Sequence, residues 1–208
     1  MSFEVTISEG EFLIQTARKA ITKYIKRGVK IKPPTNTPMK LRHKAGVFVT
    51  LNTLSDGSSH LRGCIGYPEP IFPLIEATIE SAIDAAVKDP RFNPLREEEI
   101  SQITIEVSIL TPPELISNQE TSNYENVIRV GQDGLIIERD WNKGLLLPQV
   151  PIEWGWDVEE FLAQICFKAR LPPDMWMVEG TKIYRFQAIV FQESGPNGTV
   201  VRRKLMEK

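Results

Sequence analysis

The chain has 208 residues, of which 41% are hydrophobic and 25% are charged, and its formal net charge is -2 at pH 7. These values are typical of a globular protein that is long enough to bury a hydrophobic core. A nearly neutral chain offers no basic surface for nucleic acid, and no apolar run approaches the ~20 residues needed to span a bilayer. We therefore expect neither a nucleic-acid partner nor a membrane partner.

A long amphipathic helix is predicted near the start of the chain. Ser8 and Glu11 have the spacing of a capping box, and Gly28 is a suitable residue for the helix end. The helix should therefore run from about Glu9 to Arg27. Its charged side chains are interpreted as a solvated face, formed by Arg18, Lys19, Lys23 and Lys26.

A β-hairpin is predicted next. Val47 to Leu54 has the composition of a strand, and Ser55 to Ser59 has that of a turn. The returning strand then contains Leu61-Arg62-Gly63-Cys64-Ile65-Gly66. This motif places one of only two cysteines in the chain between two glycines and close to an arginine.

The motif is the first candidate site. Arg62 and Cys64 are two residues apart, so in a strand they share a face, with Cα atoms about 7 Å apart. A guanidinium at that distance would favour the thiolate of Cys64. Gly63 and Gly66 indicate a bulge, or a close approach of another backbone or of a ligand. Alternatively, Cys64 is simply packed as a small hydrophobic residue.

A second helix and a rigid loop follow the hairpin. The helix is predicted from about Pro73 to Lys88, and Pro90 ends it because proline disfavours helical geometry at Asp89. Asp89 and Arg91 then lie two residues apart in a stiff loop, where they could clamp a ligand. The same loop could equally be a structural corner with Phe92 tucked inward.

The clearest strand runs from Ile103 to Ile109, where apolar and polar residues alternate strictly. Ile105 and Val107 should be buried, and Glu106 should lie on the opposite face. We expect Arg62, Asp89, Arg91 and Glu106 to converge on a cleft bordered by the motif, with Asp89 or Glu106 as the acid that pairs with Arg62. Gly63→Val should then remove function at a modest cost in stability.

The last part of the chain contains a second predicted hairpin, with strands Val127 to Val130 and Leu135 to Glu138. Gln149 and Glu153 follow in a loop with two tryptophans, which suits a ligand pocket and suits a tryptophan-capped core equally well. A helix from Val158 to Ala169 and a strand from Lys182 to Gln192 complete an α+β fold with a largely antiparallel sheet flanked by helices.

The chain resembles the AMMECR1-domain family. The resemblance runs from about residue 10 to residue 193 and is carried by the motif at Leu61 to Gly66 and, in order, by Gly46 to Leu51, Asp89 to Phe92, Ile105 to Leu110, Leu147-Pro148-Gln149, and Phe161-Leu162 followed by Cys166. Lys143-Gly144 and Pro151 depart from the family pattern, which has arginine-glycine and alanine there.

The resemblance implies a compact α+β protein with two subdomains. We expect the proline-rich connector at Lys32 to Pro38 to lead into the smaller one, which contains residues 39–72 and could include part of 127–150. The larger subdomain would contain residues 1–32 and 73–195. The resemblance also implies that, in prokaryotes, such proteins often accompany Memo-type and radical-SAM proteins.

Common cofactor and metal motifs are absent from the sequence. It contains no G-x-G-x-x-G, Walker loop, zinc-type cysteine pair or G-x-S-x-G, so we expect no cofactor and no metal. Two cysteines do not make a disulfide framework, which points to a reducing, cytoplasmic setting.

Two functions remain open from the sequence. One is a module that binds a small molecule or a protein partner through the motif. The other is an enzyme or a substrate-handling subunit that uses Cys64 as a nucleophile or redox thiol, working with Memo-type and radical-SAM proteins. The binding module is favoured, because no general base is evident near Cys64.

Overall fold

The structure is a computed structural model that describes residues 4–55, 57–116 and 124–203. Asp56, in the predicted turn of the first hairpin, lies outside the described residues. The chain divides into two compact units. The first comprises Met1–Leu110 with Ile189–Arg203, and within the described residues the second comprises Thr111–Ala188.

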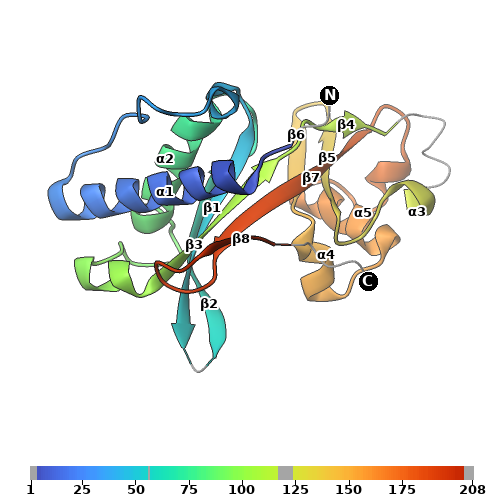
Figure 1. Ribbon diagram of the computed structural model, residues 1–208. Helices are drawn as coiled ribbons and strands as arrows, with labels where there is room; N and C mark the ends of the chain where they lie inside the picture. The colour runs from blue at the N-terminus through green and yellow to red at the C-terminus, as the bar shows by residue number, and fades with distance from the viewer. Residues whose placement is uncertain (1–3, 56, 117–123, 204–208) are drawn as a thin grey trace. The chain divides into compact units, whose positions relative to one another are not determined.

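The first unit is an antiparallel sheet with two helices packed on one face. Antiparallel pairing joins β1 to β2 and to β3, and joins the end of β7 to β8. The helices α1 and α2 contact each other, and α2 lies over β1 and β2 (Figure 1). The bounds are α1 (Ile7–Arg27), η1 (Met39–Arg42), β1 (Gly46–Ser55), β2 (Ser58–Tyr67), α2 (Leu74–Val87), η2 (Glu97–Ser101), β3 (Ile103–Leu110), β7 (Lys182–Glu193) and β8 (Val200–Arg203).

The first helix begins slightly earlier than its predicted start. Thr6 is the N-cap, and its hydroxyl accepts a hydrogen bond from the backbone N–H of Glu9 while the Glu9 carboxylate accepts one from the backbone N–H of Thr6. The capping box is therefore Thr6 with Glu9 rather than Ser8 with Glu11. Gly28 ends the helix as predicted, with φ of 64°.

One basic residue of this helix is not solvated as the sequence suggested. The guanidinium of Arg18 forms a bidentate ion pair with Glu193 at the end of β7 and also donates to the carbonyls of Ile100 and Ile103. Glu193 in turn accepts a hydrogen bond from the backbone N–H of Ile105. This buried network links α1 to β7, to β3 and to the end of η2.

The pleat of the sheet separates a core face from a polar face. Val49 on β1 pairs with Val107 on β3 and is fully buried, as are Ile105 and Val107, which confirms the predicted core of this strand. Thr50, the next residue along β1, lies between Cys64 and Glu106 on the opposite face. The polar face of β3 is also buried, because Glu106 is only 9% exposed.

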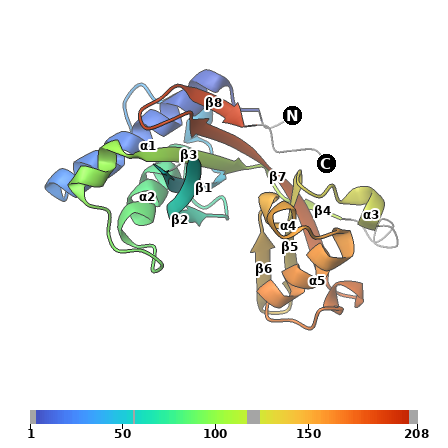
Figure 2. The ribbon, with the colours of Figure 1, turned by 90° about the horizontal axis from the view of Figure 1, so that it is seen from below.

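The second unit surrounds a smaller core that lies between α5 and the strands β5 and β7. Figure 2 shows α5 beside β5 and β6. The pairs β5–β6, β5–β7 and β4–β7 are all antiparallel. The bounds are β4 (Glu114–Leu115), α3 (Tyr124–Val127), β5 (Asp133–Arg139), β6 (Asn142–Leu146), α4 (Gln149–Trp154), α5 (Val158–Lys168) and η4 (Met175–Met177), with the first part of β7.

The second hairpin was placed incorrectly from the sequence. Tyr124–Val127 is a short helix, and the hairpin is formed by β5 and β6. Its tight turn is Asp140-Trp141, where Asp140 adopts a φ of 51°, a left-handed conformation that aspartate tolerates. The Gly131 to Gly134 segment, predicted as a hairpin turn, instead leads from α3 into β5.

The α+β class and the antiparallel sheet agree with the sequence prediction, but the compact units have other boundaries than the expected subdomains. The first hairpin belongs to the same unit as α1 and α2, because α2 packs over both of its strands. The long C-terminal strand β7 contributes its first part to one unit and its end to the other.

Candidate functional site

A β-bulge shapes the central motif. Leu51 of β1 pairs with Gly63, but the next residue, Asn52, pairs with Leu61, so Arg62 is the extra residue on β2. A bulge locally re-aims the side chain it carries. The predicted irregularity in this strand is therefore present, and it occurs at the arginine rather than at a glycine.

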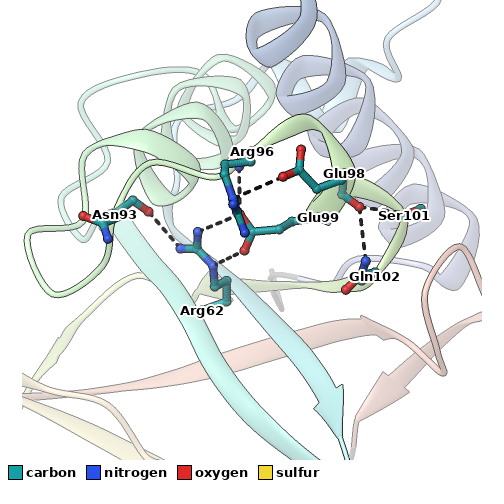
Figure 3. A network of polar contacts seen from close by, with 7 residues as sticks. All are labelled: Arg62, Asn93, Arg96, Glu98, Glu99, Ser101 and Gln102. Atoms are coloured by element: carbon teal, nitrogen blue, oxygen red, sulfur yellow. Dashed lines mark hydrogen bonds and ion pairs between the residues drawn. The ribbon is translucent and has the colours of Figure 1, made fainter.

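The bulge places Arg62 against the segment between α2 and β3. Its guanidinium donates to both carboxylate oxygens of Glu99, with Nε to Oε1 at 2.8 Å and Nη2 to Oε2 at 3.2 Å. Its Nη1 donates to the carbonyl of Asn93 at 3.1 Å (Figure 3). The acid that pairs with Arg62 is thus Glu99, and the prediction of Asp89 or Glu106 as its partner was wrong.

The two glycines of the motif accommodate other parts of the protein. A Cβ on Gly63 would lie 2.2 Å from the carbonyl oxygen of Ala85, so α2 approaches the strand at this point. A Cβ on Gly66 would lie 2.4 Å from the ring of Phe48. The space that the glycines were expected to leave for a ligand is therefore occupied by a helix backbone and an aromatic ring.

Asp89 fastens the loop after α2 to the edge of β2. Its carboxylate accepts a hydrogen bond from the backbone N–H of Cys64 at 2.8 Å and binds the guanidinium of Arg91 through both oxygens, at 2.9 and 2.7 Å. The side chain is only 2% exposed. The hydrogen bonds from Arg91 hold the pKa of Asp89 well below its ordinary value. Asp89 and Arg91 therefore act first on each other, as in a structural corner.

Phe92 joins the two arginines of this region. The guanidinium carbon of Arg91 lies 5.5 Å from the centre of the Phe92 ring, and that of Arg62 lies 5.9 Å from it. Both distances are within the range of cation–π contacts. The ring is partly exposed, so the expectation that it is tucked inward is met only in part.

Cys64 lies on the polar face of the sheet, where its sulfur accepts a hydrogen bond from the hydroxyl of Thr50 at 3.3 Å. Burial raises the pKa of the thiol, and the charges of Glu106 and Asp89 raise it further. The hydrogen bond from Thr50 and the charge of Arg91 oppose this shift, but do not reverse it. The thiolate form of Cys64 is therefore not favoured, contrary to the prediction. Arg62, whose charge was expected to favour the thiolate, is paired with Glu99 instead.

Glu106 occupies the same polar row, two strands from Cys64 across Thr50. Its carboxylate accepts a hydrogen bond from Nη1 of Arg203 at 3.1 Å. Of the predicted set, Asp89 and Arg91 meet at Cys64, and Glu106 lies in the same row of the sheet. Arg62 is directed elsewhere. Gln149 and Glu153 lie in α4, in the second unit, and not in the predicted loop.

A groove of about 490 Å³ opens beside Arg62. We call it the Arg62 groove, and its lining residues are Arg62, Phe92, Asn93, Pro94, Arg96 and Glu99. Of these residues, only Arg62 belonged to the site predicted from the sequence. Phe92 was expected only as a side chain tucked inward, and the last four were missed. Glu99 belongs to the run Glu97-Glu98-Glu99, which has the pattern of a solvated surface. Nothing in this sequence indicates which of the three glutamates forms the ion pair with Arg62.

No group of three or more histidine, cysteine, aspartate or glutamate side chains in the described residues is arranged to hold a metal ion. Within the same residues, none of the helices combines the length and apolar character required to cross a membrane.

The ionisation of Asp89 should contribute to the decrease in the free energy of unfolding at acid pH. Because the folded pKa of Asp89 is lowered, its ionisation stabilises the folded state fully above the ordinary aspartate pKa of about 3.9, and this stabilisation is lost as the pH falls below that value. The difference in unfolding free energy between wild type and Asp89→Asn should be about 2 kcal/mol at neutral pH and should shrink towards about pH 3. Urea unfolding across this range measures it, and a difference independent of pH would contradict the assignment.

Comparison with known proteins gives a consistent result. The family model described as AMMECR1 matches residues 14–191. A protein of Thermococcus onnurineus is 58% identical over 198 residues, covering 95% of this chain and 96% of that protein. Protein PH0010 of Pyrococcus horikoshii is 53% identical over 207 residues, covering 99% of this chain and 100% of the relative. The crystal structure of PH0010, described as an uncharacterized protein, matches with a TM-score of 0.87 over 97% of this chain and 99% of that chain.

Proposed function

This chain belongs to the AMMECR1 family, and we propose that it is a binding module whose ligand occupies the Arg62 groove next to the Leu61–Gly66 motif. The observation that carries the proposal is the groove itself. Its volume of about 490 Å³ lies within the range of about 300–1,000 Å³ for small-molecule sites.

The groove is supported by side chains that are already held in place. Arg62 is fixed by Glu99 and by the carbonyl of Asn93, and it contacts the ring of Phe92. Glu99 also accepts a hydrogen bond from the backbone N–H of Arg96, at 2.8 Å. A site whose side chains are ordered before binding loses less conformational entropy when the ligand arrives. The network around Arg62 and Glu99 therefore favours recognition.

The raised pKa of Cys64 supports a binding role over covalent catalysis. A nucleophilic cysteine acts as the thiolate, and the burial of Cys64 disfavours that form. The neighbouring Thr50 hydroxyl donates to the sulfur and is no general base for it.

The reactivity of Cys64 provides a direct test of this point. In a Cys166→Ala background, alkylation of Cys64 by iodoacetamide should be slow at neutral pH and should accelerate only above the ordinary thiol pKa of about 8.5. The rate is followed by mass spectrometry as a function of pH. A fast reaction with an apparent pKa below that value would instead support the enzyme hypothesis.

Ligand capture tests the groove. Wild type, Asn93→Trp and Cys64→Ala are each incubated with a cellular metabolite extract, separated from unbound compounds by ultrafiltration, and analysed by mass spectrometry. Wild type and Cys64→Ala should retain the same compound, and Asn93→Trp should lose it because the indole fills the groove. Asn142→Trp, an exposed position in the second unit, is the matched control. Retention by Asn93→Trp would contradict the proposal.

The same variants test protein partners. Memo-type and radical-SAM proteins are the candidate partners that the family resemblance implies. We infer a cytoplasmic setting for such an encounter, because both cysteines are free thiols. Co-purification with wild type that is lost with Asn93→Trp would assign the groove to a protein partner instead of a small molecule.

A further inference from the structure

We propose that the ligand of the Arg62 groove is a small organic anion, with a carboxylate or phosphate held by Arg96 and Arg62 and an apolar body lying on Phe92 and Pro94. This inference rests on the proposed binding function of the groove and adds the chemical class of the ligand.

The first argument is the balance of hydrogen-bond donors and acceptors around Arg62. A guanidinium carries five N–H donors. Arg62 uses three of them, two on Glu99 and one on the carbonyl of Asn93, so one N–H on each terminal nitrogen is left over. The Glu99 carboxylate is already engaged, because both its oxygens accept from Arg62 and one also accepts from the backbone of Arg96.

Arg96 adds more unused donors to the groove. Its side chain is 73% exposed, and its Nε lies 3.3 Å from Glu98 and 3.5 Å from Glu99. Neither of its terminal nitrogens makes a hydrogen bond to another described residue. Figure 3 shows Arg96 above the Arg62–Glu99 pair, with the side chain of Glu98 beside it. Glu98 pairs with Arg96 but does not line the groove. Among the side chains that do line it, unused donors therefore outnumber unused acceptors, and a ligand rich in acceptors satisfies them best.

The charge of the groove points the same way. Its lining carries two arginines and one glutamate, and that glutamate pairs with both arginines, with Arg62 at 2.8 Å and with Arg96 at 3.5 Å, so the lining has an excess of one positive charge. Arg91 does not line the groove, but its guanidinium contacts the ring of Phe92, which does. The side chain of Arg91 is about half exposed. Its own acid, Asp89, is buried and faces away from solvent. The charge presented to a ligand is therefore more positive than the sequence composition of the segment, which is rich in glutamate, would indicate.

The aromatic and proline side chains determine what the rest of the ligand should be. Phe92 and Pro94 both line the groove and offer apolar surface next to the guanidinium groups. A purely inorganic anion would leave this surface exposed to water, whereas an organic acid or phosphate ester would cover it.

The test uses four probes of matching shape and different charge. Benzoate and phenyl phosphate carry the two candidate anionic groups, benzamide is neutral, and benzylamine is cationic. Each is titrated at constant ionic strength into ¹⁵N-labelled protein, and the backbone amide shifts of Asn93, Arg96 and Glu99 are followed. Both anions should shift these amides saturably, and their dissociation constants should be about tenfold lower than that of benzamide. The anion with the lower dissociation constant indicates whether the groove prefers a carboxylate or a phosphate.

Two variants locate the effect. Arg96→Gln should weaken benzoate and phenyl phosphate about tenfold and leave benzamide unchanged. Arg27→Gln removes the same charge from the exposed end of α1 in the same unit, and it should bind as wild type does. Equal weakening by both variants would reveal a general charge effect and would overturn the proposal.

The outcomes separate this inference from the function beneath it. If benzamide or benzylamine binds the groove as tightly as the anions, the binding function stands and the anionic class is wrong. If no probe of any charge shifts the groove amides, the groove is not a small-molecule site and both proposals fail.

Discussion

Replacing Gly63 with valine should lower the free energy of unfolding by about 3 kcal/mol or more, well above the modest cost expected from the sequence. A Cβ at this position would lie 2.2 Å from the carbonyl oxygen of Ala85 and 3.2 Å from its carbonyl carbon. These are backbone atoms of α2, so they cannot move aside as a flexible side chain would. The helix must shift away from β2, which exposes the core between them.

Urea unfolding of the variant measures this effect. Gly195→Val is the matched control, because no atom lies within 4 Å of a Cβ at Gly195. The control should remain within about 1 kcal/mol of wild type. If Gly63→Val unfolded with the same midpoint as the control, the close packing of α2 on the motif would be wrong. The result also bears on the site, since a displaced α2 would move Asp89 away from Cys64.

Replacing Arg18 with methionine should destabilise the protein by about 3–5 kcal/mol. The substitution leaves the carboxylate of Glu193 without its guanidinium, although the side chain of Glu193 is only 4% exposed. It also removes the donors to the carbonyls of Ile100 and Ile103. A buried charge without a partner costs far more than the pair itself contributes.

The double variant Arg18→Met/Glu193→Met should recover much of this loss, because it removes the isolated charge. Lys26→Met is the matched control on the same helix. Lys26 pairs with Glu97 at the surface, where the two side chains are 48% and 62% exposed. Its loss should cost about 0.5 kcal/mol or less. Thermal or urea unfolding that gave similar values for Arg18→Met and Lys26→Met would contradict the buried network.

The segments that were correctly predicted are those in which local periodicity and burial agree. Ile105 and Val107 alternate with polar residues, and their strand forms with both side chains fully buried. Helix α2 ends at Val87, just before the Asp89-Pro90 pair that the sequence marked as its limit. The hairpin of β1 and β2 was also predicted correctly, because two strand-forming segments flank a run of turn residues.

The errors arose where a local pattern fits more than one structure. The segment before Gly131 has strand-forming residues, but Tyr124–Val127 is a helix, and Tyr124 is buried in the core of the second unit. Likewise, Gln149 and Glu153 lie in a helix that begins after Pro148, although the sequence predicted a loop there. Tertiary packing outweighs local preference in such short segments.

The sequence by itself determined the α+β class, the antiparallel sheet, the buried strand at Ile105 and the motif around which the candidate site is built. Each of these follows from periodicity, turn residues or an extended family pattern, which are properties of neighbouring residues. Only the tertiary structure decided which charges meet. Arg62 reaches Glu99 because a bulge in β2 turns it there, and Arg18 reaches Glu193 across 175 positions of the chain. Ion pairs between distant residues depend on how elements pack, and no local pattern records that choice.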